Sequence, residues 1–515
     1  MTRRDFCAQS LVWPFTLWAQ PSSQPLRARI KLDTERTIGE IDRNIYGNFI
    51  EHLGRCIQGG VFDEGSSLAD SNGYRRDVID AVKNLKVTNL RWPGGNFASG
   101  YHWRDGIGPR DTRPVRMDLA WGTTENNRFG THEFLNYTEM LGIAPYICVN
   151  LGTGTWDEAK FWVEYCNVES GTAMADLRRK SGRDKPWKVP YWGLGNEMDG
   201  PWQMGHRSAE DYGKFALEAA KLMKWTDPSI KLIAAGSSNF GPGADWIGWN
   251  RTVLQYLRTH ADYLALHTYV GNAANDYYEF LASSMDVAER TRIAEGLIRA
   301  ALAGQPSARR IWIAWDEYNV WYRARGPGQR GRRILEERYN LEDALVVATF
   351  LNAFVNHAHI VKMANMAQLV NVIAPIFTNE QGLFLQTIYY TLQLFAANSH
   401  GVALQVWLQC PTYSSRRYEA VPYLDASAAI DRGTLVVSVV NRHRDQEIET
   451  EIEIQDRDFT GPVEVAEVNG PDVKAENTFG KTLVETVRKT AAASGRRLRY
   501  RFPAHSFTML KGALR

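Results

Sequence analysis

Eight short apolar segments rich in β-branched residues alternate with helical patterns between residues 44 and 370 of this chain. Strands that alternate with helices predict a parallel sheet. Eight repeats favour a closed (β/α)8 TIM barrel of the α/β class over an open doubly wound sheet. No GxGxxG sequence follows an early strand, which argues against a dinucleotide-binding fold. The expected strands are Asn44–Ile50, Val87–Pro93, Ala144–Asn150, Val189–Glu197, Leu232–Ser238, Tyr263–Tyr269, Arg310–Asn319 and Val361–Val370.

The segments between these strands carry helix signals. Val78, Ile79, Val82 and Leu85 recur at the spacing of one helix face between the first two expected strands. Gly142 stands where a helix should end, just before the third strand. Both features support a strand–helix repeat.

Beyond about residue 400 the hydrophobic period changes from helical spacing to two. Apolar residues alternate with glutamates through Ile448–Ile454 and with arginines through Leu498–Phe502. This pattern is typical of antiparallel strands with one face exposed to water. Ile30 and Leu32 fit the same period near the N-terminus. We therefore expect a barrel at 44–395 and an antiparallel β-sandwich at 396–515, which strands from 25–43 join.

The N-terminal segment looks like a targeting signal. Arg3 and Arg4 form a twin-arginine pair, and the apolar stretch Leu11–Ala19 follows them. Residues 1–24 are therefore predicted to be an export signal, and a cytoplasmic protein is the alternative. No segment has about 18 uninterrupted apolar residues, so no membrane insertion is expected.

The composition limits the partners of the chain. Its 60 Lys and Arg residues against 58 Asp and Glu leave a formal charge of +2, which predicts no nucleic-acid partner. The five cysteines form no CxxC pair, so a zinc ribbon is excluded. The 17 Trp and 22 Tyr fit either a packed core or rings that stack on sugars.

Two carboxylates mark the expected active site. Glu197 ends the fourth strand and Glu317 lies near the end of the seventh, at the barrel face where active sites lie. In glycoside hydrolysis one carboxyl group donates a proton to the leaving oxygen and the other attacks the anomeric carbon. A single strand-end glutamate is more often a salt-bridge partner, but these two share the rim with an arginine, a histidine, a tyrosine and several amides.

Several of these neighbours have a chemical use beside the two carboxylates. Arg91 and Tyr269 would favour the ionised form of a nearby carboxylate, and Asn196 would bind a sugar hydroxyl. A metal site at His267 and Glu317 is the weaker interpretation, because no HExxH motif or close histidine pair accompanies them. No metal and no organic cofactor is therefore expected.

Longer motifs surround these residues. They are Tyr46-Gly-Asn-Phe-Ile-Glu-His-Leu-Gly54, Arg91-Trp-Pro-Gly-Gly-Asn96, Leu194-Gly-Asn-Glu-Met-Asp-Gly-Pro-Trp202, Asp316-Glu-Tyr-Asn-Val-Trp321 and Met366-Ala-Gln-Leu-Val-Asn-Val-Ile-Ala-Pro375. In these motifs, and from about residue 28 to the C-terminus, the chain resembles the α-L-arabinofuranosidases of glycoside hydrolase family 51, in clan A. The resemblance implies a retaining enzyme with a (β/α)8 catalytic barrel and a β-sandwich. It also suggests a homo-oligomer, with a hexamer as one size.

The resemblance implies a role for each matching position. Glu197 matches the acid/base and Glu317 the nucleophile. Trp92 and Tyr318 depart from the family, which often has Tyr and Trp there, and the departures put the leaving-group preference in question. The remaining matches are the furanose-binding positions Glu51, Asn96, Asn196, Tyr269 and Gln368, the substrate-recognition position Trp321, and Arg91 and His267, which would support the charged centre.

The expected activity is exo-acting hydrolysis of terminal non-reducing α-L-arabinofuranosyl residues by double displacement. The expected substrates are arabinan, arabinoxylan or oligosaccharides derived from them. Two alternatives remain open. One is another clan A barrel glycosidase, an endoglucanase or a xylanase, and the other is a non-catalytic carbohydrate-binding protein.

Overall fold

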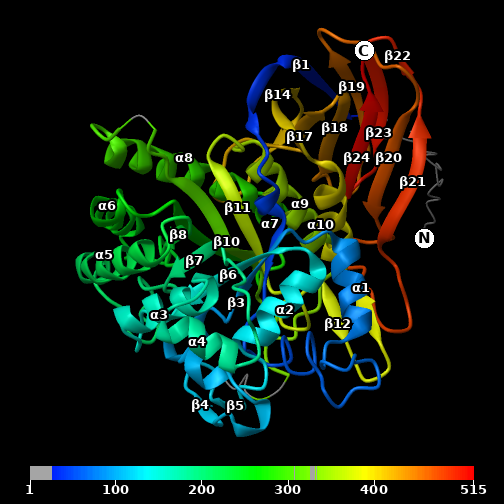
Figure 1. Cartoon of the computed structure of the whole chain (residues 1–515). Helices are drawn as coiled ribbons and strands as arrows, with labels where there is room; N and C mark the ends of the chain where they lie inside the picture. The colour runs from blue at the N-terminus through cyan, green and yellow to red at the C-terminus, as the bar shows by residue number, and fades with distance from the viewer. Residues whose placement is uncertain (1–25, 307, 325–330, 332) are drawn as a thin grey trace, which may run out of the picture.

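The structure is a computed structural model that describes residues 26–306, 308–324, 331 and 333–515. The predicted export signal, residues 1–24, lies outside the described residues. Two bodies pack side by side: a barrel surrounded by helices, and a mostly antiparallel sheet domain formed mainly by the C-terminal residues (Figure 1). No helix in the described part of the chain is long and apolar enough to cross a membrane.

Eight parallel strands close into the barrel in the order β10-β11-β2-β3-β6-β7-β8-β9. The (β/α)8 prediction is therefore confirmed, and each strand falls within or next to the segment expected for it. The strands are β2 (Gly47–Phe49), β3 (Asn89–Trp92), β6 (Ala144–Val149), β7 (Tyr191–Leu194), β8 (Lys231–Ala234), β9 (Tyr263–Val270), β10 (Trp312–Val320) and β11 (Val361–Ala367).

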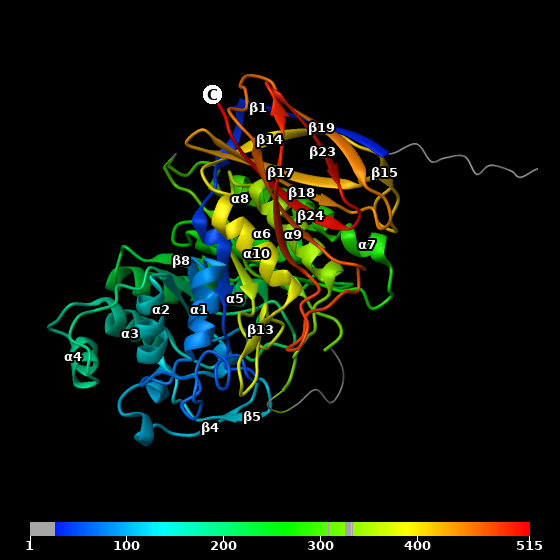
Figure 2. The ribbon, with the colours of Figure 1, turned by 90° about the vertical axis from the view of Figure 1, so that its right-hand side faces the viewer.

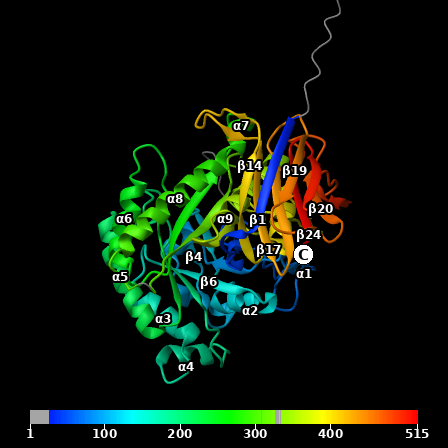
Figure 3. The ribbon, with the colours of Figure 1, turned by 90° about the horizontal axis from the view of Figure 1, so that it is seen from above.

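Helices cover the outside of the barrel (Figures 1 and 3). The face of α1 that carries Val78, Val82 and Leu85 is buried, as its spacing predicts. Gly142 ends α2 with a φ of 68°, a left-handed conformation that favours glycine. The helices are α1 (Arg76–Leu85), α2 (Thr131–Leu141), α3 (Trp156–Asn167), α4 (Ala173–Lys180), α5 (Ala209–Thr226), α6 (Trp246–Leu257), α7 (Tyr277–Leu281), α8 (Ser283–Leu302), α9 (Leu341–Val355) and α10 (Thr387–Asn398).

Most barrel strands are shorter than predicted, and the two largest differences are in β2 and β7; the one in β7 lies next to the expected site. Residues Arg43–Tyr46 form a 3-10 helix, so the first barrel strand begins only at Gly47. The fourth ends at Leu194, because Gly195 and Glu197 both have positive φ and leave the extended conformation. Glu197 therefore stands on the turn beyond the strand.

The second body is one ten-stranded sheet in the order β21-β20-β24-β18-β17-β14-β1-β19-β23-β22. Its N-terminal strand β1 pairs antiparallel with β14 and parallel with β19. The strands are β1 (Leu26–Glu40), β14 (Val402–Gln409), β17 (Leu424–Asp431), β18 (Thr434–Asn441), β19 (Ile448–Ile454), β20 (Val463–Asn469), β21 (Glu485–Ala491), β22 (Ala493–Ser494), β23 (Arg497–Phe502) and β24 (Ser506–Ala513).

This sheet folds over to form a sandwich (Figure 2). The Tyr500 hydroxyl of β23 donates to the Glu467 carboxylate of β20 at 3.0 Å, although several strands separate the two in the sheet order. The apolar residues predicted to face inward, among them Ile452 and Leu498, are buried in the core between the two halves. The predicted antiparallel sandwich is thus confirmed.

The two bodies share a buried helix. Every residue of α9 is buried, because the helix packs against the barrel on one side and against the sandwich on the other. Asn352 on α9 accepts from the Ser427 hydroxyl at 2.7 Å and donates to the Asp425 carboxylate at 2.7 Å. Three short hairpins complete the fold: β4 (Arg116–Asp118) with β5 (Thr123–Glu125), β12 (Ile376–Thr378) with β13 (Leu383–Leu385), and β15 (Thr412–Tyr413) with β16 (Val421–Pro422).

Candidate active site

A cavity of 720 Å³ opens at the carboxyl ends of the barrel strands. Arg91 and Asn196 do not line it and are buried directly behind its wall. All ten residues expected at the site thus come together at this end of the barrel. The eight that line the cavity are Glu51, Asn96, Glu197, His267, Tyr269, Glu317, Trp321 and Gln368.

A bulge in β10 shapes the floor of the cavity. Ala314 pairs with Ala265 of β9, but Glu317 pairs with His267, so β10 has one residue more than its neighbour between these two pairs. The register against β11 shifts in the same stretch. A bulge re-aims side chains that would otherwise alternate across the sheet. Consecutive residues Asp316 and Glu317 consequently both face His267.

Two donors hold Glu317. The Arg91 guanidinium donates from Nη1 to Glu317 Oε1 at 2.6 Å, and the Tyr269 hydroxyl donates to Oε2 at 2.7 Å. Arg91 also donates to Asn196 Oδ1 at 2.5 Å. A Cβ at Gly95 would lie 3.1 Å from Glu317 Oε1, so glycine at this position leaves room for the carboxylate.

Glu197 faces Glu317 across the floor. Its Oε1 lies 3.0 Å from His267 Nδ1, and its Oε2 accepts from the Trp202 indole at 2.5 Å. One carboxylate oxygen of Glu197 lies within 4.8 Å of one of Glu317. Burial raises the pKa of Glu197, and the charge of Glu317 raises it further. Glu197 is thus the carboxyl group of the pair that is suited to carry a proton.

His267 links the carboxylates of the floor. Its Nδ1 lies 3.0 Å from Glu197 and its Nε2 lies 3.1 Å from Asp316. Burial alone would lower the pKa of His267, but the charges of Glu317 and Asp316 raise that pKa well above its ordinary value. The pKa of Asp316, which burial alone would raise, is lowered instead by Arg91 and His267. A positively charged imidazolium that donates from both ring nitrogens fits this arrangement.

Glu51 forms a separate carboxyl site on the cavity wall. It accepts from the Phe97 backbone N–H at 3.0 Å, from the Trp121 indole at 3.1 Å and from the Gln368 amide at 3.0 Å. Burial, with the charge of Glu317, nevertheless raises the pKa of Glu51 to about 8. Glu51 is therefore suited to hold a neutral carboxyl group against a sugar hydroxyl.

The floor also contains a possible set of metal ligands. Ligand atoms of Glu197, His267 and Glu317 lie within 4.8 Å of one another. However, both ring nitrogens of His267 face carboxylates, and an imidazolium has no lone pair for a cation. A site that works without a metal or organic cofactor remains the prediction.

Sequence reasoning missed some of the groups that complete the site. Asp316 carried no assigned role, and strict strand alternation would place it on the face opposite Glu317. Trp202 and Trp121 also carried no assigned role, yet each donates its indole N–H to a carboxylate of the cavity. The available signal was the position of Trp202, five residues after Glu197 on the same turn.

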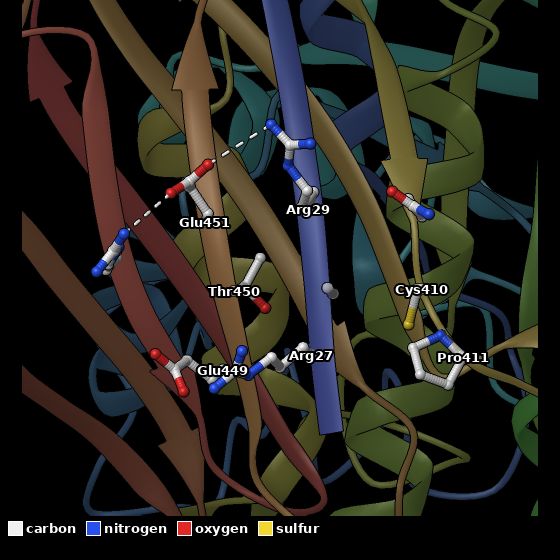
Figure 4. Close-up of a pocket in the computed structure, with 10 residues that line it drawn as sticks. Arg27, Arg29, Cys410, Pro411, Glu449, Thr450 and Glu451 are labelled. Carbon is white, nitrogen blue, oxygen red and sulfur yellow. Dashed lines mark hydrogen bonds and ion pairs between the residues drawn. The ribbon is translucent and has the colours of Figure 1, made fainter. Parts of the chain in front are cut away.

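A second cavity, of 600 Å³, lies on the sandwich (Figure 4). Its charged lining comes from side chains such as Arg29, Glu451 and Arg499, which form ion pairs of 3.4 to 3.6 Å on the sheet surface. These side chains stay partly in water, with 75% of the Arg499 side chain exposed. No histidine and no aromatic residue lines this cavity. It lacks the buried carboxylate pair, so the barrel cavity is the candidate active site.

Comparisons with known proteins agree with this geometry. Residues 81–288 match the family model described as "Alpha-L-arabinofuranosidase 1 domain", and residues 316–506 match "Alpha-L-arabinofuranosidase C-terminal domain". The chain is 42% identical over 464 residues to the "Intracellular exo-alpha-(1->5)-L-arabinofuranosidase 1" of Bacillus subtilis, covering 88% of this chain and 92% of that protein. This chain belongs to the α-L-arabinofuranosidases of glycoside hydrolase family 51.

Other similar proteins give the same result. The "Alpha-L-arabinofuranosidase C" of Emericella nidulans is 41% identical over 94% of this chain and 97% of its own length. The crystal structure of the Thermotoga maritima α-L-arabinofuranosidase in complex with arabinose has a TM-score of 0.87 at 39% identity, covering 94% of this chain and 99% of that one. A family 51 α-L-arabinofuranosidase from Bifidobacterium longum has a TM-score of 0.90 at 32% identity, covering 95% of this chain and 100% of that one.

Proposed function

We propose that this family 51 enzyme removes terminal non-reducing α-L-arabinofuranosyl residues from arabinan, arabinoxylan or their oligosaccharides, with retention of anomeric configuration. The observation that carries the retaining mechanism is the short separation of Glu197 and Glu317, whose nearest carboxylate oxygens lie within 4.8 Å. Retaining glycosidases place the two carboxyl groups about 5–5.5 Å apart, whereas inverting enzymes need about 6.5–9.5 Å to admit a water.

In the first step Glu317 attacks C1 of the arabinofuranose. Arg91 and Tyr269 orient the attacking carboxylate through their bonds to its two oxygens. Glu197, whose pKa burial and the Glu317 charge raise, gives its proton to the departing oxygen. The C1–O bond to the leaving group breaks, and a covalent glycosyl-enzyme ester forms at Glu317.

In the second step the same two residues exchange roles. Ester formation removes the negative charge of Glu317, and with it one of the causes that raise the pKa of Glu197. Glu197, now ionised, takes a proton from water, and the water oxygen attacks C1. The ester breaks, arabinose leaves and Glu317 is regenerated as a carboxylate.

The remaining cavity residues are proposed to bind the sugar. Glu51 and Gln368, joined at 3.0 Å, present a carboxyl and amide pair to hydroxyl groups, and Asn96 lies beside them on the wall. Trp321 packs its ring edge-on to Tyr269 with centroids 5.5 Å apart, which gives an apolar side to the same cavity. Asn196 is assigned to a hydroxyl next to the acid, where Arg91 fixes its amide.

The test is hydrolysis of aryl glycosides. We expect release of the phenol from 4-nitrophenyl α-L-arabinofuranoside, with the β-D-xyloside and β-D-glucoside cleaved at least about 100-fold more slowly. Preferred cleavage of the xyloside or the glucoside would support an endoglucanase or xylanase instead, and no cleavage of any glycoside would support a carbohydrate-binding protein. Proton NMR of the first product would show the α-anomer, and a first-formed β-anomer would rule out retention.

Location and assembly are further proposals. The Arg3-Arg4 pair supports export, while the B. subtilis relative is named intracellular, so cytoplasmic location stays the alternative. Fractionation of cells that express the chain with and without the Arg3→Lys and Arg4→Lys changes distinguishes the two. The family resemblance supports a homo-oligomer such as a hexamer, which light scattering of the purified protein tests.

A further inference from the structure

A hairpin of the sandwich domain reaches the barrel close to the active site. Strands β15 and β16 and the loop between them lie beside α7, away from the ten-stranded sheet (Figure 3). Tyr413 and Val421 of the hairpin pack with Ala282, which follows α7 on the barrel side. The Tyr413 hydroxyl also donates to the Tyr278 carbonyl at 3.1 Å. The hairpin is thus held against the barrel by an apolar contact of its own.

Two neighbouring arginines at the tip of this hairpin form ion pairs with the barrel in different places. Arg416 binds Asp276, just before α7, at 3.0 Å. Arg417 binds Asp286, in the first turn of α8, at 2.8 Å. Arg417 lines both the cavity that contains Glu197 and Glu317 and a neighbouring groove, whereas Arg416 lines only the groove.

Arg417 belongs to a small cluster on the outer wall of the active-site cavity. Asp286 also pairs with Arg290, one turn further along α8. The Arg290 guanidinium lies over the Phe240 ring, 3.7 Å from its centroid. All four of these side chains line the same cavity as the catalytic carboxylates. This part of the cavity wall therefore combines an aromatic ring with guanidinium groups.

Only one of the three guanidinium nitrogens of Arg417 donates a hydrogen bond within the described part of the chain. Nη2 donates to Asp286, and no acceptor among the described residues contacts its Nε or Nη1. Its side chain is 56% exposed, whereas that of Arg290 is only 15% exposed. Asp286 thus holds the guanidinium in place at the cavity wall, and its Nε and Nη1 groups stay available to a ligand. Such a pre-oriented guanidinium is suited to bind sugar oxygens or a carboxylate.

We propose that Arg417, supplied by the sandwich hairpin, binds the saccharide on the leaving-group side of the scissile bond. The ligand is the part of the saccharide that carries the arabinofuranosyl group. The recognised atoms are oxygen acceptors: hydroxyl or ring oxygens of its neutral sugars, or the carboxylate of a uronic acid substituent. The Phe240 ring gives the same sugar an apolar surface. This assignment rests on the proposed exo-acting hydrolysis and extends it to the leaving group.

The test compares Arg417→Ala with Arg416→Ala. Both changes remove one hairpin arginine and one ion pair with the barrel, but only the first removes a donor from the cavity. Each variant is assayed on an α-1,5-linked arabino-oligosaccharide and on 4-nitrophenyl α-L-arabinofuranoside, whose leaving group is an aryl ring without hydroxyls. A bond from a charged donor predicts that Arg417→Ala lowers kcat/KM on the oligosaccharide about tenfold, mainly through KM, and by less than about threefold on the aryl substrate.

Arg416→Ala should change both substrates equally and by less than about twofold, as expected for a surface ion pair. Equal losses on the two substrates in Arg417→Ala, or the same oligosaccharide loss in Arg416→Ala, would overturn the proposal and assign the arginines to docking of the hairpin. Failure of the unmodified enzyme to cleave the aryl arabinofuranoside would instead overturn the proposed function itself.

An acidic substrate distinguishes the two kinds of acceptor. An arabinosylated xylo-oligosaccharide with a glucuronic acid substituent is compared with the same oligosaccharide without it. A larger loss of kcat/KM on the acidic substrate in Arg417→Ala assigns the guanidinium to the carboxylate, and equal losses assign it to neutral sugar oxygens. No loss on either oligosaccharide would contradict the proposal.

Discussion

The barrel cavity and the sandwich cavity both lie beside ion pairs of arginine and glutamate, yet they differ in chemistry. At the barrel cavity Glu317 meets Arg91, which is buried behind the wall, at 2.6 Å, and the side chains of Arg91 and Glu317 are only 1% and 6% exposed. In the sandwich cavity Arg499 and Glu451 meet at 3.4 Å with side chains 75% and 21% exposed (Figure 4). Water screens the second pair, while burial strengthens each interaction of the first. Burial, and not residue type, separates the proposed catalytic charge cluster from a solvated sheet face.

The largest expected effect is the loss of activity when the buried glutamate of the barrel cavity is removed. Glu317→Ala should lower kcat/KM on the aryl arabinofuranoside at least about 10⁴-fold, because no nucleophile remains to form the ester. The matched control is Glu451→Ala, which removes a glutamate from the sandwich cavity and should change the rate less than about twofold. Comparable losses of activity in the two variants would contradict the assignment of the chemistry to the barrel cavity.

The next effect depends on the leaving group. Glu197→Ala should lower kcat/KM about 10³-fold on arabino-oligosaccharides, because their alkoxide leaving group needs the proton. The rate of the first step should change little with 2,4-dinitrophenyl arabinofuranoside, because its phenolate leaves without receiving a proton. A series of aryl arabinofuranosides measures this as the slope of log kcat/KM against leaving-group pKa. The same fractional loss on good and poor leaving groups would contradict the acid role.

A stability measurement sharpens the comparison between buried and exposed charge. Asp316→Asn leaves the buried Arg91 and His267 without one of their carboxylate partners and should cost about 3 kcal/mol of unfolding free energy. Glu451→Gln on the sandwich should cost less than about 1 kcal/mol. Urea unfolding at one pH gives both values. Equal costs would mean that burial does not set the strength of these pairs.

The last prediction concerns a change that is gradual with pH. The pKa of Glu51 is raised from 4.5 to about 8 in the folded state by burial and by Glu317. Between these values the folded state binds more protons than the unfolded state, so this group makes stability fall as pH rises, by up to about 1.4 kcal/mol per pH unit. The Glu51→Gln side chain does not bind a proton in this pH range, so its contribution to stability does not change with pH. The stability of this variant relative to the unmodified enzyme should therefore increase from about pH 5 to pH 8 in urea unfolding, and a constant difference would contradict the raised pKa.

Much of the fold follows from local patterns. The eight barrel strands and the paired sandwich strands β19 and β23 appear in the sequence as changes of hydrophobic period. Strand ends cluster at one face of a barrel, so Glu197 and Glu317 were predictable as neighbours although 120 residues separate them. The bounds were less predictable, because the positive φ at Gly195 and Glu197 ends β7 before the motif does.

By itself, the sequence determined the periodicity, and with it the barrel, the sandwich and the set of residues that end the strands. Only the tertiary structure decided how those residues meet. The bulge in β10 turns Asp316 toward His267, against the alternation that its position implies. The docked hairpin brings Arg417 to Asp286, 131 residues away. The physical reason is that periodicity records only which face of an element is buried, whereas bulges and docking contacts depend on the elements that pack against it.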